Sequence, residues 1–256
     1  MKLHAALGVA LCTGALAAAQ AGAQAYPAKP IRVIVPFPAG GTSDILTRMI
    51  GAEITKAWGQ QVLADNRPGA NGNIGVELLV RSAPDGYTLI LMDVGNLTIS
   101  PSVFRKLPFD ILRDMAPVSM VSYSSHLTGE CDVLFLGMLQ SLHHAKSGKV
   151  KALAVSSDKR DPALPDVPTV GETPGLEGFV TGSWQGMLAP ARTPPEIVAR
   201  VNAEVVRIIG QPDIREKLTS QGTTPLPMSP PEFGKWLIEQ KDRWAKLVKD
   251  TGFTLE

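Results

Sequence analysis

The stretch VIVPFPAGGTSDILTRMI, residues 33–50, decides the fold class of this sequence. It overlaps an apolar, β-branched run, Ile31–Val35, of the kind found in buried parallel strands. A Pro-x-Pro segment and two glycines interrupt the run, and from Thr42 the apolar residues recur with helical spacing. A strand, a glycine turn and a helix in this order predict a βα unit of an α/β protein.

The same order of elements recurs further along the chain. A second strand is predicted at Val62–Asp65, the turn NRPGANGNIG follows at 66–75, and a third strand is predicted at Tyr87–Met92. Ile74, Leu78 and Leu79 then suggest a short helix after this turn. Strands that alternate with helices are typical of a doubly wound sheet, so we expect that architecture here.

The middle of the chain is less regular, and the C-terminal part is clearly helical. Ala116–Val121 and Val133–Leu136 are expected to be strands on either side of a polar stretch at 122–130. Thr193–Glu196 and Ser229–Glu232 each match a capping box with proline at the first helical position. The first helix is expected to bury Ile197, Val198, Val201, Val205, Ile208 and Ile209. The apolar stripe of the last helix would be Phe233, Trp236, Leu237, Trp244, Leu247 and Val248.

The first 25 of the 256 residues have the pattern of an export signal. Lys2 precedes an apolar segment at 5–19, and two A-x-A cleavage sites follow at 21–23 and 23–25. We expect a cleaved signal peptide and a periplasmic protein; a retained anchor is the alternative. The formal net charge of +1 argues against a nucleic-acid partner. After cleavage Cys131 would be the sole cysteine, so no internal disulfide is expected.

The two glycine-rich corners are the strongest functional signal. Each follows a predicted strand and precedes a predicted helix, which leaves backbone N–H groups that favour an anion. Neither corner has the Lys of a phosphate loop or the spacing of a dinucleotide fingerprint, so a single carboxylate fits better than a polyphosphate. Ordinary tight turns are the structural alternative. Asp44, in the first turn of the first helix, either complements the helix dipole or accepts a ligand hydroxyl or amine.

Catalytic signals are weak throughout the sequence. The Ser of Gly182–Gly186 is one place too early for G-x-S-x-G, and no H-E-x-x-H or paired-Cys motif occurs. Cys131 is interpreted as a core residue, with a nucleophile as the alternative. We therefore expect no catalytic residues, no metal and no cofactor.

Several longer motifs together resemble one family. YPAKPIRVIVPFPAGGTSDILTR, NRPGANGNIG, APDGYTLILM, ALPDVPTVGE and WQGMLAPARTPPEIVARVNAEV occur in the same order as in the Bug family, the solute receptors of tripartite tricarboxylate transporters. The resemblance implies an α/β fold like that of type II periplasmic binding proteins, in which two lobes close on a small organic acid. It also implies delivery of this ligand to membrane permease subunits, and we expect the receptor to be a monomer.

The resemblance also implies a set of ligand-binding residues. The first binding loop would contain Phe37, Ala39, Gly40, Gly41 and Asp44; the neighbouring loop Gly69, Ala70, Asn71 and Gly72; and the second lobe Asp132. Residues 1–25 would be the signal peptide, 26–118 and 182–256 lobe 1 with the C-terminal helices, and 119–181 lobe 2.

The sequence departs from the family between Val121 and Asp132, where family members carry much more chain. About two βαβ-type units of ~30 residues each are missing, so lobe 2 is expected to be truncated. Besides a carboxylate receptor, two other functions stay open: a degenerate, non-binding paralogue or sensor-partner protein, and an α/β hydrolytic enzyme. The enzyme would need a nucleophile paired with a base, and the sequence offers no such pair.

Overall fold

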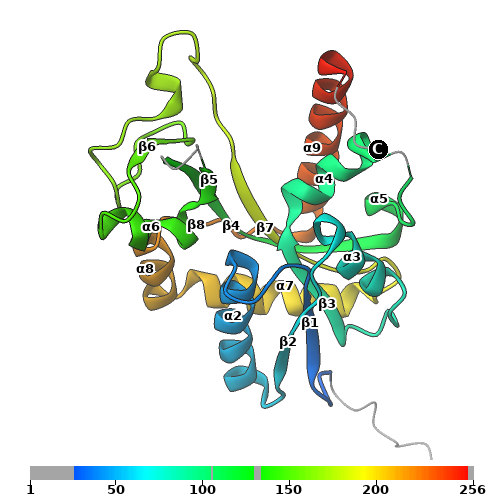
Figure 1. Cartoon of the computed structure of the whole chain (residues 1–256). Coiled ribbons are helices and arrows are strands. Elements are labelled where there is room, and N and C mark those ends of the chain that lie inside the picture. The colour runs from blue at the N-terminus through cyan, green and yellow to red at the C-terminus, as the bar shows by residue number, and fades with distance from the viewer. Residues whose placement is uncertain (1–25, 105, 130–133, 253–256) are drawn as a thin grey trace, which may run out of the picture.

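The computed structural model describes residues 26–104, 106–129 and 134–252, and in them the strands form one mixed sheet (Figure 1). The strand order is β2-β1-β3-β7-β4-β5, and β6 and β8 also pair with β4. The strands are β1 (Ile31–Val35), β2 (Val62–Asn66), β3 (Thr88–Asp93), β4 (Met115–Gly129), β5 (Leu134–Gly137), β6 (Ala152–Val155), β7 (Gly182–Pro190) and β8 (Thr223–Pro225).

Helices cover both faces of the first part of this sheet. They are α2 (Thr42–Trp58), α3 (Asn73–Val80), α4 (Val94–Val103), α5 (Ile111–Asp114), α7 (Pro195–Gly210), α8 (Pro212–Ser220) and α9 (Pro230–Thr251), while α6 (Met138–Lys146) lies beside β5 and β6. β1 pairs in parallel with β2 and β3, and β3 pairs antiparallel with β7. The predicted strand–helix–strand–helix–strand unit is therefore confirmed as the parallel end of the sheet.

Two buried clusters hold the helices on the sheet. On one face, Leu46 and Ile50 of α2 pack with Val201 and Val205 of α7. On the other face, Leu79 of α3 belongs to a cluster with residues of α4 and α9. A parallel strand needs apolar cover on both faces, which explains the continuous β-branched run of β1.

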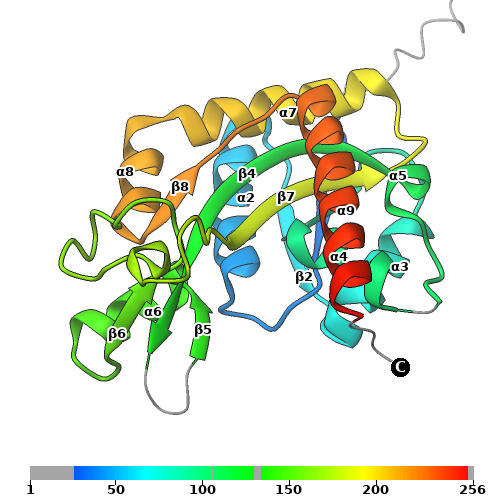
Figure 2. The ribbon, with the colours of Figure 1, turned by 90° about the horizontal axis from the view of Figure 1, so that it is seen from above.

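Two long strands join this part of the molecule to a smaller one (Figure 2). β4 pairs with β7 along the register from Met115–Pro190 to Ser125–Gly182, and then with β5 and β6 at its far end. We predicted a strand only to Val121; in the structure β4 continues to Gly129, because backbone pairing can continue through polar residues. The predicted boundary between residues 118 and 119 falls inside this continuous strand.

The smaller part contains β5, β6, α6 and the connection from residue 157 to 181. Among the side chains that the structure describes there, only Met138, Leu142 and Val155 form a buried cluster. Partly buried neighbours complete it: Ala145, Ala152, Ala163, Leu164 and Val167. These described side chains belong to the core of the smaller part, and the β4–β7 ladder joins this part to the large one.

One predicted helix start needs correction, and in α3 the structure decides which apolar residues are buried. α7 begins at Pro195 with Pro194 as its N-cap, so Glu196 is one position short of a capping box, and the hydroxyl of Thr193 is buried without a hydrogen-bond partner. The short helix suggested by Ile74, Leu78 and Leu79 is present as α3; Val76 and Leu79 are buried in it, whereas Ile74 and Leu78 are exposed. The reason is Gly75, which faces the sheet: a methyl group there would lie 2.6 Å from Pro36 Cβ.

The last helix begins as predicted, and most of its predicted apolar stripe is buried or half-buried. Ser229 Oγ accepts from the Glu232 amide at 3.4 Å, and the Glu232 carboxylate accepts from the Ser229 amide at 2.9 Å, which is a complete capping box. Phe233 and Leu237 are buried, Trp236, Trp244 and Val248 are half-buried, and Leu247 is 48% exposed. The second half of α9 runs beyond the sheet, which leaves Leu247 exposed (Figure 1).

Candidate functional site

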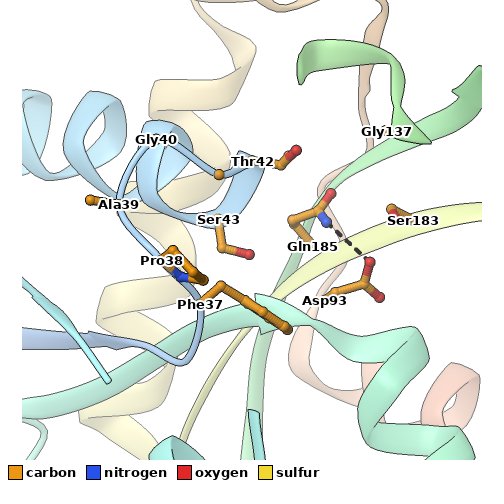
Figure 3. Close-up of a pocket in the computed structure, with 11 residues that line it drawn as sticks. Phe37, Pro38, Ala39, Gly40, Thr42, Ser43, Asp93, Gly137, Ser183 and Gln185 are labelled. Carbon is orange, nitrogen blue, oxygen red and sulfur yellow. Dashed lines mark hydrogen bonds between the residues drawn. The ribbon is translucent and has the colours of Figure 1, made fainter. Parts of the chain in front are cut away.

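A cavity of about 490 Å³ opens at the N-terminus of α2, beside the C-terminal end of β3 and the start of β7 (Figure 3). It lies at the carboxyl ends of the parallel strands, where open α/β sheets bind ligands. The lining residues are Phe37, Pro38, Ala39, Gly40, Gly41, Thr42, Ser43, Asp93, Gly137, Ser183 and Gln185. Of the predicted site residues, Phe37, Ala39, Gly40 and Gly41 are therefore brought together here.

The N-terminus of α2 presents donors to this cavity. Gly41 is the N-cap and has no side chain to cap the helix. The first helical bond is donated by Ile45 to the Gly41 carbonyl at 3.0 Å. The amides of Thr42, Ser43 and Asp44 thus have no acceptor within the helix, and the helix dipole adds positive potential at the same place.

Asp44 lies behind this corner and does not line the cavity. Its carboxylate accepts from the Gly40 amide at 2.9 Å, from the Asn66 side chain at 3.1 Å and from Arg48 at 3.1 Å. Burial acts to raise the pKa of Asp44, but these bonds outweigh it, so the pKa lies below its ordinary value. The Gly40 amide, which was expected to be available to a ligand, therefore already donates to Asp44. The donors that remain available are the amides of Thr42, Ser43 and Asp44.

The opposite wall is built by neighbouring strands. Asp93, the last residue of β3, is in register with Gln185 of β7. Asp93 Oδ1 accepts from the Gly95 amide at 2.8 Å and so caps α4, and Gln185 Nε2 donates to Asp93 Oδ2 at 3.5 Å. Figure 3 shows these two side chains across the cavity from Thr42 and Ser43.

The second glycine corner supports the cavity from outside. Gly69, Ala70, Asn71 and Gly72 all have positive φ, at 130°, 47°, 54° and 90°. None of them lines the cavity, but a methyl group on Gly72 would lie 3.5 Å from the Phe37 ring. This corner therefore contacts the back of a lining residue. Asp132 lies outside the described residues.

The smaller part of the molecule reaches the cavity through Gly137, which precedes α6. A methyl group on Gly137 would lie 3.6 Å from Thr42 Oγ1, so the two parts come close to contact at this point. Gly137 is the sole contribution of this part among the lining residues that the structure describes.

Sequence reasoning missed the polar residues Thr42, Ser43, Asp93, Ser183 and Gln185. The sequence could have predicted Thr42, Ser43 and Asp93. Each of them directly follows a glycine corner or a predicted strand, and so lies at the edge of the sheet where ligands bind. Ser183 and Gln185 had none, because only the pairing of β7 with β3 brings them here.

No group of His, Cys, Asp and Glu side chains within the described ranges could hold a metal ion. No helix in those same ranges combines the length and apolar character needed to cross a bilayer.

The fold and the cavity are those of one class of protein, the α/β solute-binding proteins. The family model for the tripartite tricarboxylate transporter family receptor matches residues 46–132 and 121–253. The chain belongs to this receptor family, and the Bug-family resemblance is confirmed.

Individual relatives agree with the family assignment. Protein BugT of Bordetella pertussis is 29% identical, with 100% of this chain and 99% of that protein aligned. The structure of MatC from Rhodopseudomonas palustris with bound malate is 27% identical, with a TM-score of 0.82 over 87% of this chain and 100% of that one. The structure of a periplasmic transporter is 25% identical, with a TM-score of 0.85 over 91% of this chain and 100% of that one. These matches confirm the predicted fold class, that of periplasmic binding proteins.

The alignments also bear on the length of the chain. The alignment with BugT covers 324 positions although this chain has 256 residues, so 68 positions have no residue of this chain. The two segments matched by the family model overlap at residues 121–132. This overlap falls where the sequence departs from the family, and it agrees with an internally shortened member.

Proposed function

We propose that this protein is exported to the periplasm, captures a small organic carboxylate there and delivers it to the permease subunits of a tripartite transporter. The cavity at the N-terminus of α2 carries the proposal, because its size suits a small ligand and its donors suit an anion. MatC, which has malate bound, supports a ligand of this class. The proposed arrangement keeps residues 1–25 as signal peptide, 26–118 with 182–256 as lobe 1, and 119–181 as a truncated lobe 2.

The electrostatics of the cavity favour one carboxylate over a phosphorylated ligand. No Lys or Arg occurs among the lining residues that the structure describes. A helix N-terminus stabilises an adjacent negative charge by about 0.3–1 kcal/mol at exposed sites and up to ~2 kcal/mol when partly buried. This is enough to hold one carboxylate together with the amides of Thr42 and Ser43, and too little for several phosphate charges.

The proposed ligand contacts follow from this geometry. The backbone from Phe37 to Gly41 would surround the carboxylate, and the first amides of α2 would donate to it. Asp44 would hold the Gly40 corner in shape, and the corner from Gly69 to Gly72 would support Phe37. Asp132 remains a proposed contact from lobe 2.

Native mass spectrometry of the exported protein tests the proposal directly. We expect a co-purified acid of low mass that dissociates on unfolding. Isothermal titration of the stripped protein with small mono-, di- and tricarboxylates should then give a micromolar or tighter dissociation constant for at least one of them. Absence of binding across the set would refute the receptor proposal.

A second candidate, a non-binding paralogue, is favoured by one observation: 68 of the 324 positions aligned with BugT have no residue of this chain. A truncated lobe would leave the cavity more open to water, and binding would lose the contribution of desolvation. The same titration separates the two candidates. A paralogue of this kind would be folded, with a cooperative thermal transition, and would show no heat of binding.

A further inference from the structure

The cavity contains a feature that a pocket for a simple acid does not need. Among its described lining residues, Asp93 is the only one with a charged side chain, and that charge is negative. A carboxylate is an acceptor, so the ligand group that meets it must be a donor or a cation. A ligand that places a second carboxylate next to Asp93 would be repelled by it. A ligand that places an apolar end there would offer the Asp93 carboxylate no hydrogen-bond donor.

We propose that Asp93 receives a protonated amine of the ligand, so that this receptor selects amino acids over acids of the same length that lack the amine. The inference rests on the proposed function, since it assumes a carboxylate at the N-terminus of α2. The cavity then has two poles. The amides of Thr42 and Ser43 bind the ligand's carboxylate, and the Asp93 carboxylate binds its ammonium group by a charge-assisted hydrogen bond.

The carboxylate of Asp93 is held in a fixed position by its surroundings. Gly95 donates its amide to Oδ1 at 2.8 Å, and Gln185 approaches Oδ2 through Nε2 at 3.5 Å. Gln185 is itself 2% exposed, and its Oε1 accepts from Ser122 Oγ at 3.5 Å, which orients the amide with its nitrogen toward Asp93. A group positioned in this way loses little freedom when a ligand binds.

Capping of α4 alone does not account for an aspartate at this position. Ser, Thr and Asn cap helices about as well as Asp, and they would do so without placing a negative charge in a cavity that binds anions. The same comparison provides the test. An Asn or Ser at position 93 keeps a cap for α4 and removes only the charge, so loss of folding is not the expected result.

The experiment compares amino acids with their matched acids on the wild-type protein. The probes are L-aspartate with succinate, L-glutamate with glutarate, and a thermal-shift panel of the other proteinogenic amino acids with their deaminated counterparts. We expect the aminated member of the best-binding pair to have a dissociation constant about 10- to 100-fold lower than its partner. In Asp93→Asn and Asp93→Ser this preference should fall to about threefold or less, with the matched acid bound as well as or better than before.

Asp110→Asn provides the matched control. Asp110 caps α5 by accepting from the amides of Leu112 and Arg113, and it does not line the cavity. This variant should keep the wild-type preference.

The outcomes are distinct. If acids bind but the unaminated members bind equally well, or if the preference survives both Asp93 variants, the inference is overturned and the receptor function stands. If none of the amino acids and none of their matched acids binds, both the proposed function and this inference are refuted.

Discussion

Replacing Gly41 by aspartate should weaken ligand binding by roughly 200-fold without destabilising the protein. Gly41 is the N-cap of α2, with φ −74° and ψ 166°, a conformation that any residue adopts easily. Aspartate is among the best N-cap residues. Its carboxylate would accept from the first amides of the helix, which are the donors we assign to the ligand. The substitution therefore places a covalent competitor in the proposed anion site.

The two effects have different sizes. The cap and the helix dipole together contribute about 0.3–1 kcal/mol in favour of folding, and repulsion from Asp44 one turn away reduces this gain. For a protein of this length the melting temperature should change by about 0 to +3 °C. Two carboxylates about 5 Å apart at an effective dielectric constant of about 20 repel each other by ~3 kcal/mol, which corresponds to roughly a 200-fold loss of affinity.

The assay is titration calorimetry with the tightest acid from the panels above, paired with a thermal melt of each variant. Gln211→Asp is the control, because Gln211 is the uncapped N-cap of α8 and does not line the cavity. It adds the same charge at a helix N-terminus and should leave the affinity within about twofold. Binding by Gly41→Asp within threefold of wild type would refute the assignment of the α2 amides to the ligand carboxylate.

Three further predictions concern stability, each measured by urea unfolding. Ser229→Ala should cost about 1 kcal/mol of unfolding free energy because it removes the capping box of α9. Thr193→Val should be neutral or stabilising because the Thr193 hydroxyl is buried without a partner. A larger cost for Thr193→Val than for Ser229→Ala would contradict this reasoning. Phe233→Ala should cost about 3–5 kcal/mol of unfolding free energy because the ring is fully buried. Ile238→Ala, at an exposed position of the same helix, should change it by no more than about 0.5 kcal/mol. Similar costs for both variants would contradict the packing described for α9. Hydrogen bonds from Arg113 and the Asp110 amide hold the pKa of Asp114 at about 2, below its unfolded value of about 3.9. This carboxylate therefore stabilises the fold above pH ~4, and the contribution is lost as the pH falls toward 2. Asp114→Asn should therefore lose less stability than wild type between pH 4.5 and pH 2.5, and parallel acid limbs would show that Asp114 contributes nothing.

Local sequence order was sufficient for much of the large part of the molecule. The β-branched run, the two glycines and the helical spacing after Thr42 predicted β1, the corner and α2, because each is decided by residues adjacent in the chain. Proline and Ser–x–x–Glu signals located the starts of α7 and α9 for the same reason. The sequence did not decide which apolar residues of α3 are buried, because this depends on a neighbouring segment: Gly75 lies against Pro36, and Leu79 is buried while Ile74 is exposed.

The glycine corner, and the prediction that it binds one carboxylate and not a phosphate, could be derived from the sequence alone, since backbone amides at a helix start need no distant partner. The other pole of the cavity could not. Asp93 and Gln185 are 92 residues apart, and only the antiparallel register of β3 and β7 sets them side by side. Likewise, only the folded structure shows that the Gly40 amide is occupied by Asp44 and that Gly137 approaches Thr42 from the smaller part. Local conformation depends on near neighbours in the chain, whereas a binding site depends on which distant segments the sheet brings together.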